Sequence, residues 1–202
     1  REQRGNLLML GAGGCPPLLD IDMGFHPSHG RKLNCFSRMN NLWRETVLNN
    51  DVDRVYFSFA QNTLFDRTVD FIDMRGEEDF GENRYSAVRN VLKRTIDFYQ
   101  QRGVEVTLIE DLPNSNMEEY ESCLWRSGSQ EKCLPRLKLS TNNKEYDQLL
   151  SELEASGTTI LRTRASLKTF PFTDSSSKQY FIYRDNQHLS KQGSTYVIRS
   201  SL

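Results

Sequence analysis

The chain has 202 residues, a formal net charge of −1 and 37% hydrophobic residues, a length that fits one domain with a sizeable core. A mean hydropathy of −0.65, with no run near the ~20 apolar residues of a spanning helix, excludes a transmembrane segment within this sequence. Its lysines and arginines are scattered, whereas nucleic-acid binding needs a concentrated basic face, so we expect no nucleic-acid partner.

The first part of the chain alternates between apolar runs and a helical pattern. Asn6–Leu10 is a strand-like run that ends in glycines. Residues 16–34 are expected to form a loop, because prolines and glycines interrupt any pattern. Apolar residues spaced three and four apart then predict a helix over 36–48. Val52–Ala60 is the clearest strand, and its near-continuous apolar second half predicts a parallel strand covered on both faces.

The middle of the chain contains one well-defined helix and one strand between two polar stretches. Residues 62–82 are expected to be an irregular acidic excursion. Helical periodicity over 85–99 predicts a second helix, and 104–109 is the next strand. A long polar stretch follows over 111–142, and its acidic part, 110–121, is interpreted as a solvated loop.

The last third completes an alternating pattern. Leucines at helical spacing predict a third helix over 146–153, followed by a short strand at Thr158–Leu161. Residues 178–183 are strand-like, and residues 190–200 are expected to close the chain with a helix. The alternation of strands and helices predicts a three-layer α/β/α fold with a parallel sheet. Because the sequence has neither repeats nor a linker, we expect one domain over 1–202.

Four cysteines allow three pairings. Cys15 and Cys35 bracket a loop rich in proline, glycine and histidine, while Cys123 and Cys133 bracket a second short segment. Two local loops, each closed by its own pair, suit an oxidising compartment, so we predict these two disulfides. The alternative is four reduced, buried cysteines in a cytosolic protein. No C-x-x-C motif is present, so neither zinc nor a redox dithiol is expected.

The C-terminal region contains a D-x-x-H-L-S-x-x-G pattern that begins at Asp185 and ends at Gly193. An aspartate three residues before a histidine can lie on the same side of a tight turn. The carboxylate of Asp185 then holds one ring nitrogen of His188, and the other nitrogen accepts a proton from a hydroxyl nucleophile. The alternative is that Asp185 caps a C-terminal helix and His188 is an ordinary surface residue.

This block, the Gly11–Pro17 segment (GAGGCPP) and the order of the cysteines resemble the SGNH hydrolase/acyltransferase superfamily. The similarity is closest to the SGNH domain fused to bacterial acyltransferase-3 membrane proteins, and it extends over essentially the whole chain. It implies a flavodoxin-like domain with His188 as general base and Asp185 as the residue that orients it.

The same resemblance implies donors for the oxyanion that forms during acyl transfer. The backbone N–H of Gly13 or Gly14 is one candidate donor. The side chain of Asn62 is the other, in an Ala-Gln-Asn triplet where the family pattern is G-x-N. The departure at Ala60 leaves a second interpretation open, in which Asn62 caps the end of a strand.

The nucleophile of the resembled family is a serine in a Gly-Asp-Ser-type block, and this sequence contains no Gly-Asp-Ser. The opening residues 1–5 read as the tail of a helix that ends in a glycine, and the first residue is not methionine. We therefore expect the chain to begin after the first strand and first helix of the domain. The serine is expected upstream of Arg1.

A few aromatic and histidine side chains outside these blocks also need an interpretation. His26 and His29 suggest a metal site or, with the serine between them, a substitute nucleophile, but a solvated loop fits their surroundings better. We therefore predict no metal and no cofactor. Trp43 lies at helical spacing and is expected in the core. Trp125, beside Arg126, either stacks on a sugar or anchors its loop in the protein surface.

The function that the resemblance implies is O-acyl transfer, in the simplest case acetyl transfer, onto a cell-surface glycan such as lipopolysaccharide O-antigen. The acyl donor would come from an acyltransferase-3 membrane domain, and the site would be periplasmic or otherwise extracytoplasmic, tethered to the bacterial inner membrane. One alternative is a carbohydrate or lipid O-acetyl esterase that uses water as acceptor. Another is a non-catalytic glycan-binding module on a decayed SGNH scaffold.

Overall fold

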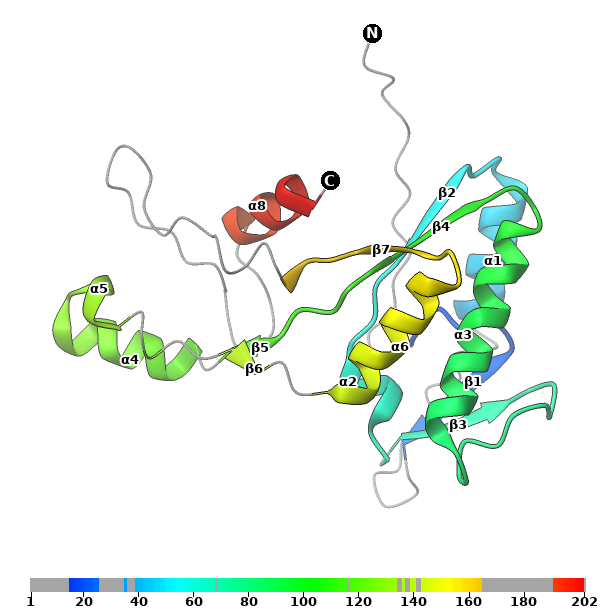
Figure 1. Cartoon of the computed structure of the whole chain (residues 1–202), viewed down its shortest axis with the longest axis horizontal. Helices are drawn as coiled ribbons and strands as arrows, with labels where there is room; N and C mark the ends of the chain where they lie inside the picture. The colour runs from blue at the N-terminus through cyan, green and yellow to red at the C-terminus, as the bar shows by residue number, and fades with distance from the viewer. Residues whose placement is uncertain are drawn as a thin grey trace, which may run out of the picture. The chain divides into compact units, whose positions relative to one another are not determined.

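The chain forms two compact units, residues 1–107 and 108–202, and each is described by itself (Figure 1). The computed structural model describes residues 15–25, 35, 39–67, 69–115, 117–133, 136, 139–140, 143–164 and 191–201. Within these ranges, no helix has both the length and the apolar composition needed to cross a membrane. The predicted strands at 6–10 and 178–183 lie outside the described residues.

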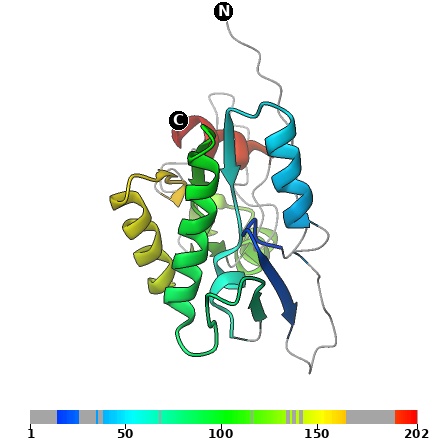
Figure 2. The same ribbon diagram turned by 90° about the vertical axis from the view of Figure 1, so that its right-hand side faces the viewer.

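The first unit combines helices with a small antiparallel ribbon and the first half of a parallel sheet. Figure 2 shows α1 and α3 running alongside β2 in this unit. Its elements are β1 (Ile21–Phe25), α1 (Asn41–Asn49), β2 (Arg54–Phe57), α2 (Gln61–Phe65), β3 (Val69–Asp73), α3 (Arg84–Gln100) and the start of β4 (Glu105–Ile109).

Helix α3 is the main core element of the first unit, as its periodicity predicts. It begins with a cap, because the side chain of Asn83 accepts a hydrogen bond from the Ser86 N–H at 3.1 Å. One face is buried, formed by Ala87, Val88, Val91, Leu92, Thr95, Ile96 and Tyr99. The chain leaves the helix through Gly103, whose φ of +79° is a left-handed conformation that glycine adopts without strain.

Strands β1 and β3 pair antiparallel, with Ile21 opposite Asp73 and Phe25 opposite Val69. The expectation of a loop over 16–34 is therefore wrong for 21–25, where β1 lies, and that of an irregular stretch over 62–82 is wrong for 62–65 and 69–73, where α2 and β3 lie. The missed signal was alternation: β3 is buried, exposed, buried, exposed, buried along its five residues. Two of its five residues are aspartates, the outward Asp70 and the buried Asp73, so the sequence was interpreted as an acidic loop.

Strand β2 is shorter than predicted, whereas helix α1 lies where the sequence predicts it. The strand is four residues long and alternates between exposed and buried side chains. Tyr56 is 45% exposed, so the prediction of a strand covered on both faces is wrong. On that outward face Arg54 forms an ion pair with Glu105 of β4. Helix α1 spans Asn41–Asn49, and residues 35 and 39–40 ahead of it are also helical, so the described residues agree with the helix predicted over 36–48. Trp43 is buried in it, which confirms its predicted place in the core.

The second unit contains most of the short elements. They are the end of β4, β5 (Asn114–Ser115), α4 (Met117–Ser127), α5 (Gln130–Cys133), β6 (Leu139–Ser140), α6 (Lys144–Ala155), β7 (Thr159–Leu161) and α8 (Lys191–Ser201). Helix α6 confirms the prediction over 146–153 and starts slightly earlier, at a cap in which Asn143 accepts from the Tyr146 N–H. Helix α8 confirms the predicted C-terminal helix.

Between residues 111 and 142, the described part of the chain contains more helix and strand than the sequence predicts. Helices α4 and α5 fold back on each other there (Figure 1), and β5 pairs antiparallel with β6. The interpretation of 110–121 as a solvated loop is wrong, because Glu110 is only 5% exposed, β5 and the start of α4 occupy the stretch from Asn114, and Tyr120 is 1% exposed. Met117, Tyr120, Cys123 and Leu124 form an apolar stripe at helical spacing in α4, and the acidic residues between them hid it in the sequence.

Strands β2, β4 and β7 form a parallel three-stranded sheet in that order. Strand β4 starts where the Glu105 N–H donates to the carbonyl of Asp53, and just beyond its end the Glu110 N–H donates to the carbonyl of Leu161. Strands of a parallel sheet alternate in sequence with helices, as here. The structure confirms the predicted α/β class.

Candidate functional site

Most of the predicted site residues lie outside the described residues: Gly13, Gly14, Asp185 and His188. Asn62 lies in α2, directly after Gln61 at the end of the connection from β2, and the structure describes its backbone but not its side chain. These five roles remain predictions. The structure does describe what supports two of them, namely the segment that follows Gly14 and the β2–α2 connection.

Both predicted disulfides are present. Cys15, the residue after Gly14, is bonded to Cys35, with their Cα atoms 5.5 Å apart and Cys35 buried. Cys123 of α4 is bonded to Cys133 of α5, with a Cα–Cα distance of 5.6 Å. In the chain-entropy model, closing loops of these lengths stabilises the folded state by about 3 kcal/mol each. The first bond thus restrains the chain immediately after the candidate oxyanion glycines.

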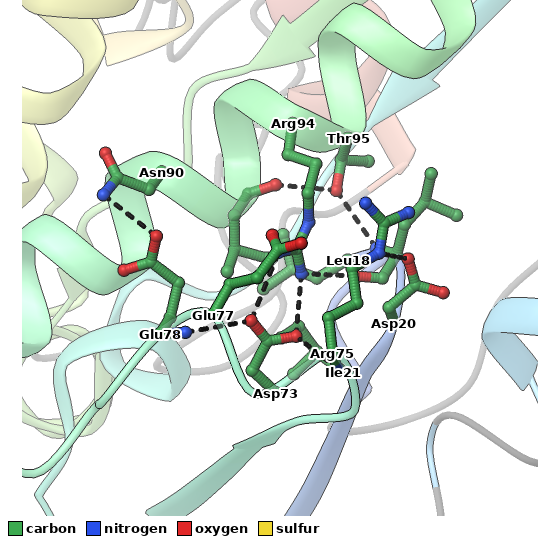
Figure 3. A network of polar contacts seen from close by, with 12 residues as sticks. Leu18, Asp20, Ile21, Asp73, Arg75, Glu77, Glu78, Asn90, Arg94 and Thr95 are labelled. Atoms are coloured by element: carbon green, nitrogen blue, oxygen red, sulfur yellow. Dashed lines mark hydrogen bonds and ion pairs between the residues drawn. The ribbon is translucent and has the colours of Figure 1, made fainter.

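Residues Leu18–Ile21, which we call the anchor segment, are held by side chains from distant parts of the first unit (Figure 3). The Asn40 amide Nδ2 donates to the carbonyl of Leu18 at 2.6 Å and to that of Ile21 at 3.1 Å. Asn40 is only 3% exposed. One buried amide therefore bridges both ends of the segment, where the carbonyls would otherwise lack donors.

Helix α3 and the end of β3 hold the middle of the anchor segment. The Leu19 N–H donates to Thr95 Oγ1 at 3.0 Å, and that hydroxyl donates in turn to the Val91 carbonyl at 2.9 Å. The Asp20 carbonyl accepts from the Met74 N–H at 2.8 Å. Backbone groups along the segment are thus paired with partners far away in sequence, which fixes its position against α3.

Asp20 has a φ of +59°, an uncommon conformation for a residue other than glycine. Such a conformation persists where the surroundings over-determine it. Here the Asp20 carboxylate forms an ion pair with Arg75, whose Nε is 2.6 Å from Asp20 Oδ2, and a longer one with Arg44, whose Nη1 is 3.8 Å from Oδ1. Ion pairs therefore reinforce the turn that the backbone hydrogen bonds define.

Beneath the anchor segment lies a buried ion pair between Asp73 and Arg94. Arg94 Nη2 is 2.9 Å from Asp73 Oδ1, and the Asp73 side chain is fully buried. Arg94 also pairs with Glu77 at 2.7 Å. Burial alone raises the pKa of Asp73, but the hydrogen bonds from Arg94 and from the Arg75 N–H outweigh it and hold that pKa below its usual value. Asp73 is therefore a charged strut that joins β3 to α3.

In the second unit, a buried carboxylate lies at the carboxyl end of β4. Glu110 is 5% exposed and accepts from the Arg164 N–H at 3.0 Å, with Arg162 at 3.4 Å. Thr163 donates its hydroxyl to the Glu110 carbonyl at 2.9 Å. Ligands of open α/β sheets bind beyond the carboxyl ends of strands. Because its oxygens are already paired, Glu110 acts as a tie between β4 and β7 rather than as a catalytic base.

Tyr146 of α6 completes this tie. Its hydroxyl accepts from the Asp111 N–H at 2.8 Å, and burial raises its pKa well above the usual range. Within the described residues there is no group of histidine, cysteine and acidic side chains arranged to hold a metal ion. The polar clusters described above in both units position backbone segments.

Comparison with known proteins supports the resemblance. A family model described as "SGNH domain (fused to AT3 domains)" matches residues 1–200. The periplasmic domain of a lipopolysaccharide acetyltransferase from Salmonella ser. Paratyphi A has a similar fold, with a TM-score of 0.56 and 14% identity over 93% of this chain and 67% of that one. At this identity the likeness shows the fold alone.

A second solved structure, described as a platelet activating factor from Streptococcus pneumonia, aligns less well. Its TM-score is 0.38 with 18% identity, over 74% of this chain and 57% of that one. No curated protein sequence matches the chain. The family match and the first structural likeness together confirm an SGNH-type α/β fold.

Proposed function

The chain belongs to the family of SGNH domains that are fused to AT3 domains, and we propose that it transfers acyl groups to glycan hydroxyls. The acyl group is acetyl in the simplest case, and the acceptor is a cell-surface glycan such as lipopolysaccharide O-antigen. An acyltransferase-3 membrane domain supplies the acyl donor. The observation that carries the proposal is the family match over residues 1–200, which includes the Asp185–His188 block.

The proposed chemistry is two acyl transfers through a serine ester. His188 Nε2 or Nδ1 takes the proton of a serine hydroxyl as its oxygen attacks the acyl carbonyl, and Asp185 stabilises the resulting imidazolium. The imidazolium then protonates the leaving group of the donor. In the second half, a glycan hydroxyl loses its proton to His188 and attacks the serine ester. Collapse of that intermediate returns the proton to the serine.

The negative oxygen formed in each half needs fixed donors. The backbone N–H of Gly13 or Gly14 and the side chain of Asn62 are the proposed donors. Two observations support the glycines: the Cys15–Cys35 bond and the anchor segment restrain the chain that follows them. Such restraint is what an oxyanion site requires, because donors that need no reorganisation contribute most. Asn62 is supported only by its place after β2.

Location outside the cytoplasm is part of the proposal. Both cysteine pairs form disulfides, and such bonds persist in oxidising compartments. The family description, an SGNH domain fused to AT3 domains, supports attachment to a membrane domain. Together these observations favour a periplasmic domain tethered to the inner membrane.

The test is turnover of an acetyl ester by the protein as its gene encodes it, whatever flanks residues 1–202. His188→Ala should lower kcat by about 10³-fold or more, because removing one triad member disables the unit. His29→Ala is the matched control, a histidine predicted to lie in a solvated loop, and should retain wild-type turnover. Near-wild-type activity of His188→Ala would contradict the assignment.

The same assay separates the proposal from its alternatives. An acyltransferase gives acylated glycan when a polysaccharide acceptor is added, whereas an esterase releases free acetate regardless of acceptor. A non-catalytic module gives no turnover with the wild-type protein.

A further inference from the structure

Trp125 is the most exposed large apolar side chain among the described residues, with 90% of its surface accessible. The others in this class are at most 57% exposed, and all of them lie in the first unit. A tryptophan left in water forgoes the burial that usually stabilises this residue type. Its position therefore needs a reason other than the stability of the fold.

Helices α4 and α5 pack against each other through residues other than Trp125. The inward face of α4 presents Tyr120 and Cys123, both nearly fully buried, and the disulfide joins Cys123 to the buried Cys133 of α5. Ser127 Oγ lies 3.0 Å from Cys133 Sγ and fills the same side. A rigid, covalently closed helix pair thus presents Trp125 outward.

The surroundings of Trp125 on the helix are polar. Glu121 and Ser122 lie one turn earlier on the same face, and both are exposed. Arg126 is exposed as well, and its Nε donates to the Ser122 carbonyl at 3.0 Å, which turns the guanidinium back along this turn. A flat aromatic ring is therefore bordered by a carboxylate, a hydroxyl and a guanidinium.

Three kinds of occupant compete for such a ring, and two fit poorly. A protein partner needs about 800 Å² of complementary surface per side, with several apolar anchors. In the described part of the second unit Trp125 is the one exposed large apolar side chain. An anionic membrane surface attracts basic segments, but exposed Glu118, Glu119 and Glu121 share the helix with Trp125.

A saccharide fits both features. The C–H face of a pyranose ring packs on an aromatic plane, while its hydroxyls need charged or polar partners at the edge. We propose that Trp125 is a stacking platform for one sugar ring of the glycan acceptor, with Glu121 and Arg126 binding that sugar's hydroxyls. The identity of the glycan as acyl acceptor rests on the proposed function; the binding itself does not.

The test is the affinity of the protein, as its gene encodes it, for lipid-free, de-O-acetylated O-polysaccharide, measured by calorimetry. Trp125→Ala should weaken binding about tenfold or more, as expected for an aromatic residue at the centre of a binding site. Trp125→Phe should restore part of the affinity because it keeps an aromatic face. Leu48→Ala, a change at an exposed apolar residue of the first unit, is the matched control and should bind as wild type.

Competing occupants are tested in parallel with vesicles of phosphatidylethanolamine and phosphatidylglycerol. The proposal is wrong if the polysaccharide does not bind, if Trp125→Ala binds it as tightly as wild type, or if Trp125 is needed for vesicle binding instead. Because this assay measures binding, it is independent of turnover. Failure of the His188 prediction would leave the glycan-binding result valid, and failure of glycan binding would leave the turnover result valid.

Discussion

The anchor segment and the α4–α5 pair are two small regions fixed by opposite means. The anchor segment is held by residues far away in sequence: Thr95 is 76 positions from Leu19, and Asn40 is 22 positions from Leu18. The α4–α5 pair is held by a bond between cysteines only 10 positions apart. The first arrangement ties backbone position to the core of its unit, whereas the second builds a local support whose outer surface is free of core contacts.

The two regions should therefore respond differently to mutation. Disturbing the contacts of the anchor segment should destabilise the first unit and affect catalysis together. Disturbing the outer face of α4 should alter binding and leave stability unchanged. The predictions below test that contrast, beginning with the largest expected effect.

Removing the strut beneath the anchor segment should have the largest effect on stability. Of the two carboxylates that pair with Arg94 in Figure 3, Asp73→Ala leaves only Glu77, and breaking a buried pair costs about 3–5 kcal/mol. We expect about 3 kcal/mol, because Glu77 remains. Urea unfolding measures it, with Asp70→Ala on the exposed face of the same strand as control. A loss below about 1 kcal/mol would show that the strut is dispensable.

Removing each disulfide should separate the two regions functionally. Replacing Cys15 and Cys35 by serine, or Cys123 and Cys133 by serine, should each lower the free energy of unfolding by about 3 kcal/mol. Only the first double variant should lower kcat for ester turnover, and only the second should weaken polysaccharide binding. The contrast fails if both variants lose the same property.

A single hydrogen bond to the anchor segment should have a smaller effect. Thr95→Val keeps the shape of the side chain but leaves the buried Leu19 N–H without its acceptor, which costs about 1–3 kcal/mol. Thr46→Val, on the exposed side of α1, is the control, because its hydroxyl bonds only within its own helix. Equal destabilisation by the two changes would mean that the bond to Leu19 contributes nothing specific.

Helices α3 and α6 and the cysteine pairing were predictable because their signals are local. Helix α6 has a cap, a leucine stripe and a terminal glycine within a short stretch of sequence. Strand β3 was missed because its buried end is Asp73, a residue that reads as surface until its partner on α3 is known. Asn40 and Thr95 gave no signal at all, since their roles depend on contacts made only after folding.

The free energy of unfolding should depend on pH through the buried ion pair between Asp73 and Arg94. The pKa of Asp73 is lowered in the folded state, so its contribution is present above the unfolded value of about 4 and is lost as pH falls through the lower folded value. Asp73→Asn should therefore flatten the fall in stability below about pH 4, measured by urea unfolding at a series of pH values. An unchanged acid limb would contradict the assigned pKa direction.

Trp125→Ala should have the smallest effect on stability, within about 0.5 kcal/mol of wild type, because the side chain is 90% exposed. Thermal unfolding measures this directly. A clear loss would mean that the indole supports the α4–α5 pair, as in the interpretation of Trp125 as a loop anchor.

The most direct test of the proposed function is the mass of the glycan after incubation with an acetyl donor and the protein as its gene encodes it. We predict that wild-type protein adds acetyl groups to de-O-acetylated O-polysaccharide and that His188→Ala and Asp185→Asn do not. Acetate released with no gain in glycan mass would instead identify an esterase. An unmodified glycan together with an intact donor would contradict acyl transfer altogether.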